Sequence, residues 1–356
     1  MSDGSAAPVL VAMSGGVDSS VAAAWMLRAG HEVVGATMVL WGGDSDTGCC
    51  SVSEVEDARR VCHQLGIDHV VFNFTDDFSR HVVDRYVDDH ASGRTPNPCI
   101  ECNRHLKFDR FLERAAALGF SRIATGHHAR VVLRERRHAL IRGVDPQKDQ
   151  SYVLSMLTQQ ELSRCEFPVG EMLKADVRAI AGDLGLRTAA KPDSQDVCFV
   201  TRAHGRSGFL APRLSFTPGR VVADTGEELS TVPAVELVTV GQRRGLGVPS
   251  HLRRYVTDID RVNATVTVGS LARLRVGREA LRLITWTHEP RWGACDVQVS
   301  AHGTPMAAEV VASGDGAQLI WKSPQRRVAP GQTVAFYSGD EVLGAALVAD
   351  QLPAAP

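Results

Sequence analysis

The segment Ser14-Gly15-Gly16-Val17-Asp18-Ser19-Ser20 constrains the fold more than any other part of the chain. The apolar run before it, Val9 to Met13, predicts a buried strand, and the alanine-rich run after it predicts a helix that stops at Gly30. Two glycines at such a turn let backbone N–H groups approach a ligand, and the helix dipole favours negative charge there. The pattern therefore predicts an anion site, although it lacks the lysine of a Walker A loop.

Length and composition indicate a water-exposed globular protein of more than one domain. The chain has 356 residues, 44% of them hydrophobic, which predicts two or three domains with ample cores. It has no apolar run of about 18 residues and no secretory pattern at Met1 to Pro8, so we expect no membrane span and no export. Eight cysteines in such a chain are expected to be reduced thiols, which favours a cytoplasmic location.

Charge is distributed unevenly along the chain. The formal net charge is -2, which excludes a protein that is basic throughout. The stretch from Arg94 to Gln150 nevertheless holds 12 Lys and Arg against 6 Asp and Glu. This stretch predicts one surface that faces a polyanion, although a solvated basic face would leave the same pattern.

Strand and helix patterns alternate in the first half. Strands are predicted at Val33 to Leu40, Ile67 to Phe74 and Arg122 to Thr125, and helices at Glu54 to Leu65, Phe78 to Val87 and Leu106 to Leu118. Such alternation predicts a parallel sheet with helices on both faces. Ligands of these sheets bind beyond the carboxyl ends of the strands, where the glycine turn and Gly126-His127 both lie. We therefore expect the two segments to converge on one nucleotide.

After about Gly205 the helical periodicity fades. Short alternating segments predict strands at Arg220 to Ala223, Val235 to Val240, Tyr255 to Ile259 and Ala264 to Val268, and a similar pattern runs from Leu281 to Val348. The predicted fold is α/β: a doubly wound parallel sheet, then a small β-rich central domain and a C-terminal β-barrel. The expected domains are residues 1–205, 206–275 and 276–356.

Three cysteines have neighbours that suggest chemistry. Cys99 and Cys102 lie in a proline-containing stretch that is expected to be a rigid loop, with Cys102 just before a helix, a position that favours the thiolate. Cys198 lies in a second polar loop. Three readings stay open: half of a zinc site, a dithiol redox pair, or two thiols that handle a persulfide. The other five cysteines are interpreted as buried or incidental: Cys49, Cys50, Cys62, Cys165 and Cys295.

Taken together, these motifs resemble a known family. The glycine turn resembles the pyrophosphate loop of PP-loop ATPases, which cleave ATP between its α and β phosphates. The whole chain resembles the tRNA-specific 2-thiouridylases of the MnmA type. The matching segments are Ser14 to Ser20, Gly48 to Ser51, Gly93 to Cys99, Cys102-Asn103, Lys107-Phe108, Thr125 to His127, Lys148 to Tyr152, Phe167 to Gly170, Asp193 to Gln195, Cys198-Phe199, Gly241 to Leu246, Pro330 to Gln332 and Phe336-Tyr337.

The resemblance implies a role for each matching position. Cys102 would be the nucleophile, Cys198 the persulfide carrier, and Asp18 the residue that positions magnesium. ATP would be contacted by Ala12, Met13, Ser14, Gly15, Gly16, Val17, Asp18, Ser19, Met38 and Gly126. The target base would meet Asn97, Pro98 and Cys99, and other parts of the tRNA would meet His127, Lys148, Asp149, Gln150 and Gln332.

The implied reaction is 2-thiolation of the wobble uridine, U34, in tRNAs for Lys, Glu and Gln. ATP and Mg²⁺ would be needed, and a cysteine desulfurase or a relay protein would supply sulfur. Many family members have Asp where Cys99 stands, so an iron–sulfur cluster on Cys99, Cys102 and Cys198 is an alternative. The chain also departs from the family pattern at Ser300-Ala301-His302 and at Ser230 to Ala234, where tRNA contacts are expected.

Other functions predict different features. A PP-loop ligase or amidotransferase of the argininosuccinate- or GMP-synthetase kind needs no paired cysteines. A non-catalytic protein that binds adenine nucleotide or tRNA would bind without forming AMP. A structural metal protein would hold metal on its cysteines.

Overall fold

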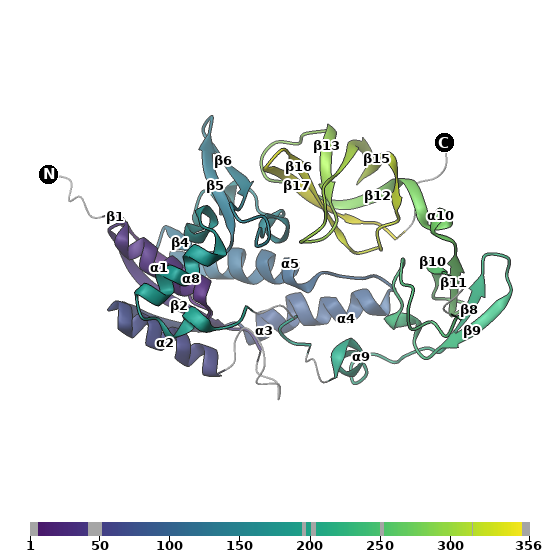
Figure 1. Cartoon of the computed structure of the whole chain (residues 1–356), viewed down its shortest axis with the longest axis horizontal. Coiled ribbons are helices and arrows are strands. Elements are labelled where there is room, and N and C mark those ends of the chain that lie inside the picture. Colours follow the sequence, from purple (N-terminus) through teal and green to yellow (C-terminus); the bar gives the residue numbers. More distant parts are fainter. Residues whose placement is uncertain are drawn as a thin grey trace.

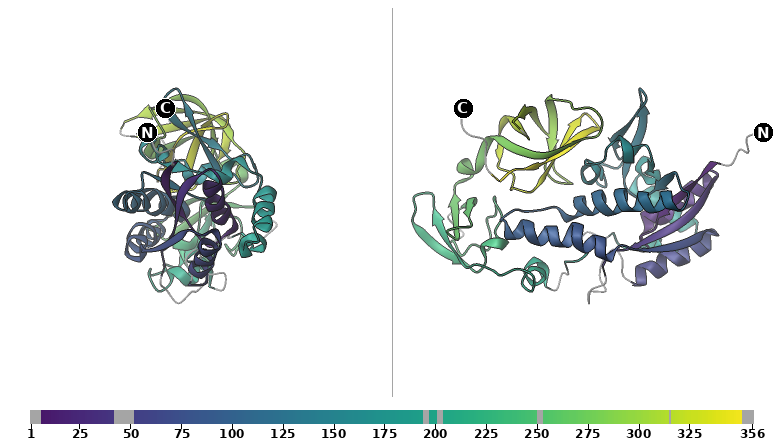
Figure 2. Two further views of the ribbon diagram at one scale, coloured as in Figure 1. Left: turned by 90° about the vertical axis from the view of Figure 1, so that its left-hand side faces the viewer. Right: turned by 180° about the vertical axis from the view of Figure 1, so that it is seen from behind.

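The computed structural model describes residues 6–41, 52–193, 197–200, 204–249, 253–314 and 316–350. The molecule is elongated, with a helix-covered sheet at one end and a small β-rich unit at the other (Figure 1). A barrel lies alongside the stretch between them, as the view from behind also shows (Figure 2).

The first sheet has five strands in the order β3-β2-β1-β4-β7, and every neighbouring pair is parallel. Val9 of β1 pairs with Val33 on one side and Arg122 on the other, so β1 is central. The ends of β1 and β4 therefore lie side by side. The strands are β1 (Ala6–Ala12), β2 (His31–Val39), β3 (Asp68–Asn73), β4 (Arg122–Ala124) and β7 (Cys165–Glu166).

Alternate residues of β1 enter two different cores. Val9 and Val11 pack with α1 (Val17–Arg28), α2 (Val52–Leu65) and α8 (Lys174–Asp183). Leu10 and Ala12 pack in the opposite core with the aromatic side chains of the helices between residues 75 and 117. Because successive strand residues point to opposite faces, both faces of the sheet are covered, and the predicted doubly wound fold is confirmed.

Two long helical stretches run side by side from the sheet toward the central unit, where Figure 1 labels α4 and α5. Each contains a π-helical stretch between α-helical parts. The first comprises α3 (Thr75–Phe78), η1 (Ser79–Val83) and α4 (Asp84–Ala91), and the second α5 (Pro98–Cys102), η2 (Asn103–Arg110) and α6 (Phe111–Ala117).

The expected loop before Leu106 is wrong, because the helix starts eight residues earlier. Asn97 caps α5 by accepting a hydrogen bond from the backbone N–H of Cys99, and Pro98 occupies the first helical position. Both are standard helix-start signals. Cys99 and Cys102 therefore lie in the first turns of a helix.

The remaining elements of the first half include a hairpin that the sequence did not reveal, β5 (Ala129–Arg134) with β6 (Arg137–Arg142). Short helices follow it: η3 (Ser151–Leu154), α7 (Gln159–Leu162), η4 (Pro168–Glu171), η5 (Arg187–Ala190) and α9 (Gly205–Leu210). The hairpin is not part of the five-stranded sheet. It belongs to the barrel sheet, where Ile141 of β6 pairs with Glu341 of β17. Arg134 and Arg137 both form ion pairs with Glu341 and hold the two parts together.

The central unit is a four-stranded sheet in the order β10-β11-β8-β9, with only β11 and β8 parallel. Its strands are β8 (Gly219–Ala223), β9 (Glu228–Val232), β10 (Tyr255–Asp260) and β11 (Thr265–Gly269). The strand expected at Val235 to Val240 is wrong: a 3-10 turn, η6 (Val235–Leu237), stands there. Val235 and Val238 both enter the small core, which accounts for the apolar pattern without a strand.

The C-terminal part is a closed antiparallel barrel, as predicted. Six strands follow one another in the order β12-β15-β14-β13-β16-β17, and β17 returns to β12. The elements are α10 (Leu271–Leu274), β12 (Arg275–Trp286), β13 (Gly293–Gln298), β14 (Met306–Ser313), β15 (Gly316–Arg326), β16 (Thr333–Ser338) and β17 (Glu341–Val348).

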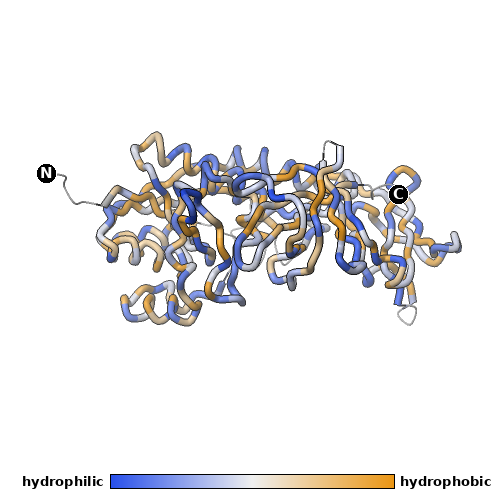
Figure 3. Tube along the Cα trace, turned by 90° about the horizontal axis from the view of Figure 1, so that it is seen from above, coloured by the Kyte–Doolittle hydropathy of each residue, from blue (hydrophilic) through white to orange (hydrophobic). Residues whose placement is uncertain are grey.

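Hydrophobic and hydrophilic segments alternate along the whole trace (Figure 3). Among the residues that the model describes, no helix has the length and apolar character needed to cross a membrane.

One buried carboxyl makes the barrel's stability depend on pH. Glu279 of β12 is 1% exposed and accepts a hydrogen bond from the backbone N–H of Val328 at 2.8 Å. Burial raises its pKa from 4.5 to about 7, against the opposing effects of that hydrogen bond and of Arg327. The folded state binds this proton more tightly than the unfolded chain does. The contribution of the protonated carboxyl to the free energy of unfolding is therefore full below about pH 4.5 and is lost as pH rises through 7.

Replacing Glu279 with Gln should remove this pH dependence. The amide keeps the acceptor for Val328 and carries no charge, so at pH 8.5 the variant should be more stable by at most about 3 kcal/mol. Near pH 5 the variant and the parent should be alike. Urea unfolding at both pH values measures the difference, with the exposed carboxyl of Glu309 on β14, replaced by Gln, as the control. Equal stability of Glu279→Gln and the parent at pH 8.5 contradicts the prediction.

Candidate active site

The glycine turn forms an open backbone loop at the start of α1. Gly15 has φ +69°, and a Cβ there would lie 2.4 Å from the carbonyl oxygen of Glu54. Inside the loop, the backbone N–H of Ser14 donates to Oγ of Ser19 at 3.2 Å, and that hydroxyl donates to the carbonyl of Gly16 at 3.1 Å. The N-cap residue of α1 is Gly16, which has no side chain to cap the helix. The loop therefore presents helix-terminal N–H groups to a ligand, which suits an anion.

Gly126 follows β4 and touches this loop directly. A Cβ on Gly126 would lie 2.6 Å from the backbone nitrogen of Ser19 and 2.7 Å from the carbonyl carbon of Asp18. The predicted convergence of the two strand ends is therefore present in the fold. Only glycine permits this approach of backbone to backbone.

Asp18 is held as a carboxylate by two neighbouring groups. Lys174 donates to both of its oxygens at 2.7 Å, and Nε2 of His128 lies 3.0 Å from Oδ1. Burial raises the pKa of Asp18, but the hydrogen bonds from His128 and Lys174 outweigh it, and the pKa lies below its usual 3.8. Asp18 is therefore ionised at neutral pH.

Lys174 also connects the loop to the segment that leads to Cys198. Its ammonium lies 3.0 Å from Oδ1 of Asp193, and Lys148 and Arg178 donate to the same carboxylate at 2.7 and 2.8 Å. Burial raises the pKa of Asp193, but the hydrogen bonds and positive charges of Lys148 and Lys174 outweigh it and lower the pKa to about 2. An ion network therefore runs from the loop to Asp193. The neighbouring Ser194-Gln195-Asp196 lies outside the described residues.

The two predicted reactive cysteines approach the same core. Cys102 is 8% exposed and lies at the end of α5, within the core that also holds Ala12 and Met38. Cys198 is partly buried and packs against that core beside Phe199. The fold thus gathers two predicted nucleotide contacts and both thiols around one cluster of side chains.

The third cysteine has a different environment, because Cys99 is exposed on the outer side of α5. Among residues 6–41, 52–193, 197–200, 204–249, 253–314 and 316–350, no group of three or more His, Cys, Asp or Glu side chains is placed to hold a metal ion. Cys99, Cys102 and Cys198 therefore do not fit an iron–sulfur cluster, and we derive no step through one. Cys49 and Cys50 lie outside the described residues.

The residues expected to contact tRNA have varied environments. His127 is buried against Phe108 and Phe167, with Nδ1 2.7 Å from Oγ1 of Thr125. Burial, helped by the positive charge of Lys107, lowers its pKa well below 6.5. A contact from His127 to RNA would therefore have to use its backbone.

Three more of these residues already have hydrogen-bond partners within the chain. Buried Asp149 accepts from Arg142, Gly143 and Ser151, and Gln150 accepts from the backbone N–H of His128. Gln332 donates to the carbonyl of Thr95. Lys148 and Asn97 are partly buried and also have partners within the chain, and Cys99 is exposed. The tRNA contacts of the whole set stay predictions.

Sequence reasoning missed three residues of this site: His128, Lys174 and Lys191. His128 adjoins His127, for which a different role, contact with tRNA, is predicted. Lys174 begins α8, four residues after the matching segment that ends at Gly170. Lys191 precedes Pro192 and Asp193, so the basic side chain beside a matching motif was the available signal.

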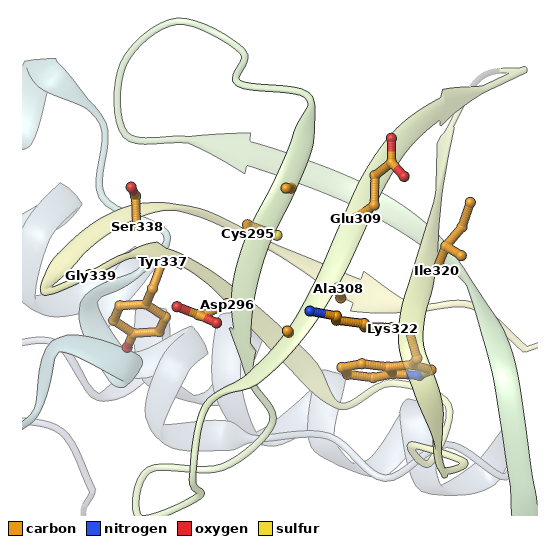
Figure 4. A pocket seen from close by; sticks show the side chains of 12 residues that line it. Cys295, Asp296, Ala308, Glu309, Ile320, Lys322, Tyr337, Ser338 and Gly339 are labelled. Atoms are coloured by element: carbon orange, nitrogen blue, oxygen red, sulfur yellow. The ribbon is translucent and has the colours of Figure 1, made fainter.

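A hollow lies on the barrel, on strands that carry none of the predicted site residues. It has a volume of about 570 Å³ and crosses strands β13 to β16, with Asp296, Glu309 and Lys322 among its lining residues (Figure 4). Cys295 also lines it, and burial raises the pKa of that thiol to about 11, so it is a weak nucleophile at neutral pH. None of the predicted site residues lines this hollow.

Comparison with known proteins covers nearly all of the chain. Three family models match: the tRNA methyl transferase HUP domain at residues 7–202, the tRNA methyl transferase PRC-barrel domain at 207–270, and the aminomethyltransferase beta-barrel domain at 280–348. Solved structures are less similar. A 4-thiouridine synthetase–RNA complex with bound ATP is 17% identical with a TM-score of 0.37, over 54% of this chain and 45% of that chain.

The curated relatives are much more similar. A tRNA-specific 2-thiouridylase MnmA of Roseiflexus sp. is 43% identical, over 96% of this chain and 99% of that protein. Proteins of the same name from Chloroflexus aurantiacus and Mycobacteroides abscessus are each 45% identical, over 96% of this chain and 98% and 99% of theirs. With matches of this extent, the chain belongs to the tRNA-specific 2-thiouridylase MnmA family.

Proposed function

We propose that this protein replaces the C2 oxygen of the wobble uridine, U34, with sulfur in tRNAs for Lys, Glu and Gln, at the expense of ATP. The observation that supports the proposal is that two residues predicted to contact ATP share a core with both cysteines. Ala12 and Met38 pack in one core with Cys102, and Cys198 packs against it. An ATP site whose contact residues share a core with two thiols would suit activation of an oxygen followed by its exchange for sulfur.

Activation comes first, because the C2 carbonyl is a poor electrophile and oxide is a poor leaving group. The C2 oxygen attacks the α-phosphate of ATP, which releases pyrophosphate and leaves AMP on that oxygen. The backbone N–H groups at the start of α1 hold the departing pyrophosphate. Magnesium, bound with the nucleotide, would neutralise phosphate charge, and Asp18 would be the carboxylate that helps to hold it. Since Lys174 now occupies both Asp18 oxygens, it would share or yield that place.

Sulfur transfer then uses both thiols. The terminal sulfur of a persulfide on Cys198 attacks C2, and AMP leaves with the former C2 oxygen. The thiolate of Cys102 next attacks Sγ of Cys198, which breaks the sulfur–sulfur bond and leaves the terminal sulfur on the base. The products are 2-thiouridine and a Cys102–Cys198 disulfide. An external dithiol reduces that disulfide, and a cysteine desulfurase or a relay protein reloads Cys198.

The tRNA must present its base out of the anticodon stack for these steps. The basic stretch from Arg94 to Gln150 supplies phosphate contacts, so affinity should fall as salt rises. Asn97, Pro98 and Cys99 begin α5 and would meet the base near Cys102. The reaction belongs in the cytoplasm, where tRNA is modified and thiols stay reduced.

Methyl transfer is the activity named by two of the family models. The paired cysteines and the pyrophosphate-type loop favour sulfur transfer instead, because methyl transfer has no use for an α-phosphate leaving group. A PP-loop ligase would likewise need neither Cys102 nor Cys198.

The test is reconstitution with the purified protein. Unmodified tRNA for Glu, MgATP, a cysteine desulfurase with cysteine, and a dithiol are combined, and the nucleosides are analysed by mass spectrometry. We expect 2-thiouridine at position 34 and one AMP per modified base. A methylated uridine, or AMP formation without any sulfur in the tRNA, would refute the proposal.

A further inference from the structure

Lys191 contacts the anion loop at the carbonyl of Gly15. Its ammonium donates to the carbonyl oxygen of Gly15 at 2.9 Å and to a carboxylate oxygen of Asp57 at 3.0 Å, and it lies 3.8 Å from the Glu54 carboxylate. The Lys191 side chain is 29% exposed, so these bonds are partly shielded from water. Both acidic residues belong to α2, whose backbone also packs on Gly15. The loop is therefore clamped between α2 and Lys191.

The clamp fixes the direction of one backbone donor. In a trans peptide the carbonyl and the following N–H point in opposite directions. A bond from Lys191 to the Gly15 carbonyl therefore turns the N–H of Gly16 away from Lys191. Gly16 is the residue before α1, where the helix-terminal N–H groups gather. A peptide between two glycines has little other restraint on its rotation.

The same short segment reaches the rest of the site. Two residues after Lys191, Asp193 binds Lys174, which in turn binds Asp18. Cys198 follows Asp193 by five residues, a span of at most about 18 Å. Lys191 and Asp193 thus fasten one segment to both ends of the Gly15–Asp18 loop.

We propose that Lys191 is a positioning residue that orients the Gly15–Gly16 peptide, so that the Gly16 N–H binds the pyrophosphate portion of ATP. The inference rests on the proposed use of this loop for ATP. Lys191 acts through the peptide and touches no reacting atom. Removal of the Lys191 ammonium should therefore weaken the binding of ligands that depend on phosphate contacts and leave the affinity for ligands without phosphate unchanged.

Calorimetric titration of the full-length protein tests this. Lys191→Met removes the donor, Lys191→Arg keeps a cationic donor, and Lys322→Met, on the barrel, is the matched control. The ligands are magnesium pyrophosphate, MgATP and adenosine, which has no phosphate. Lys191→Met should weaken pyrophosphate and MgATP binding by about tenfold to a hundredfold, the usual effect of losing one charge-assisted hydrogen bond. Adenosine binding should stay within about twofold of the parent's, and Lys191→Arg should restore much of the loss.

The outcomes separate positioning from simple support of the fold. Equal losses for adenosine and pyrophosphate, or unchanged pyrophosphate affinity in Lys191→Met, overturn the inference. Neither result depends on thiolation, so the proposed function can stand when the inference fails. A parent protein that binds no magnesium pyrophosphate overturns both.

Discussion

Cys198→Ser and Cys102→Ser should each lower the rate of 2-thiouridine formation by at least about a thousandfold, because a serine hydroxyl neither carries a persulfide nor attacks one. MgATP binding should stay unchanged, since neither thiol belongs to the anion loop. Nucleoside mass spectrometry after single-turnover reactions of the persulfide-loaded protein, without added dithiol, measures the loss. Cys295→Ser is the control, because that barrel thiol lies away from the predicted site.

The two cysteine variants should differ in what they accumulate. In Cys102→Ser the persulfide can still reach C2, but nothing releases the sulfur, so tRNA should remain attached to Cys198 through a disulfide bond. This adduct should be broken by dithiothreitol. In Cys198→Ser no adduct should form. An adduct on Cys102, or full activity in either variant, would contradict the assigned roles.

Replacing Asp18 with Asn should lower tRNA-dependent AMP release by about a hundredfold to a thousandfold. The change removes the negative charge that faces Lys174 and His128 and the carboxylate that would hold magnesium. Release of AMP and pyrophosphate in the presence of tRNA is the measurement. Asp176→Asn, an exposed change in the first turn of α8, is the control. Near-normal AMP release by Asp18→Asn would remove this residue from the site.

The pH dependence of that step has a defined sign. Since the pKa of Asp18 lies below 3.8, its carboxylate and the stability it contributes persist above that value and are lost only as pH falls through the lower folded pKa. Between pH 6 and 8 the Asp18 carboxylate therefore contributes no change in rate. Any slope in that range must come from other groups, such as the thiols.

The fold class could be predicted because periodicity and turn residues agree along most of the chain. The apolar run at Val9 to Met13, followed by two glycines and a helix, identified a buried strand and its loop. The hairpin β5–β6 escaped prediction because its turn residues, Glu135 and Arg136, have positive φ without being Gly or Asn, so the sequence lacks the usual hairpin signal. Val235 to Val240 was misassigned because a small core buries a 3-10 turn as readily as a strand.

The site was predictable where motifs carry it and not where packing decides. Cys102, Cys198 and the loop residues were named from their neighbours in sequence. His128 was not predicted, because only the fold shows that its side chain turns toward Asp18, while the rings of Phe108 and Phe167 enclose His127. Lys174 and Lys191 reach the loop from elements more than 150 residues away in sequence, so only the folded chain shows them.

The central claim is that AMP departs with the uridine oxygen before a protein-borne sulfur replaces it. The direct measurement uses tRNA whose U34 carries ¹⁸O at C2, with mass spectrometry of the AMP and pyrophosphate from one turnover. The account predicts the ¹⁸O in the phosphate of AMP and none in pyrophosphate or water. Label retained in the thiolated tRNA, or released into water with unlabelled AMP, would contradict it.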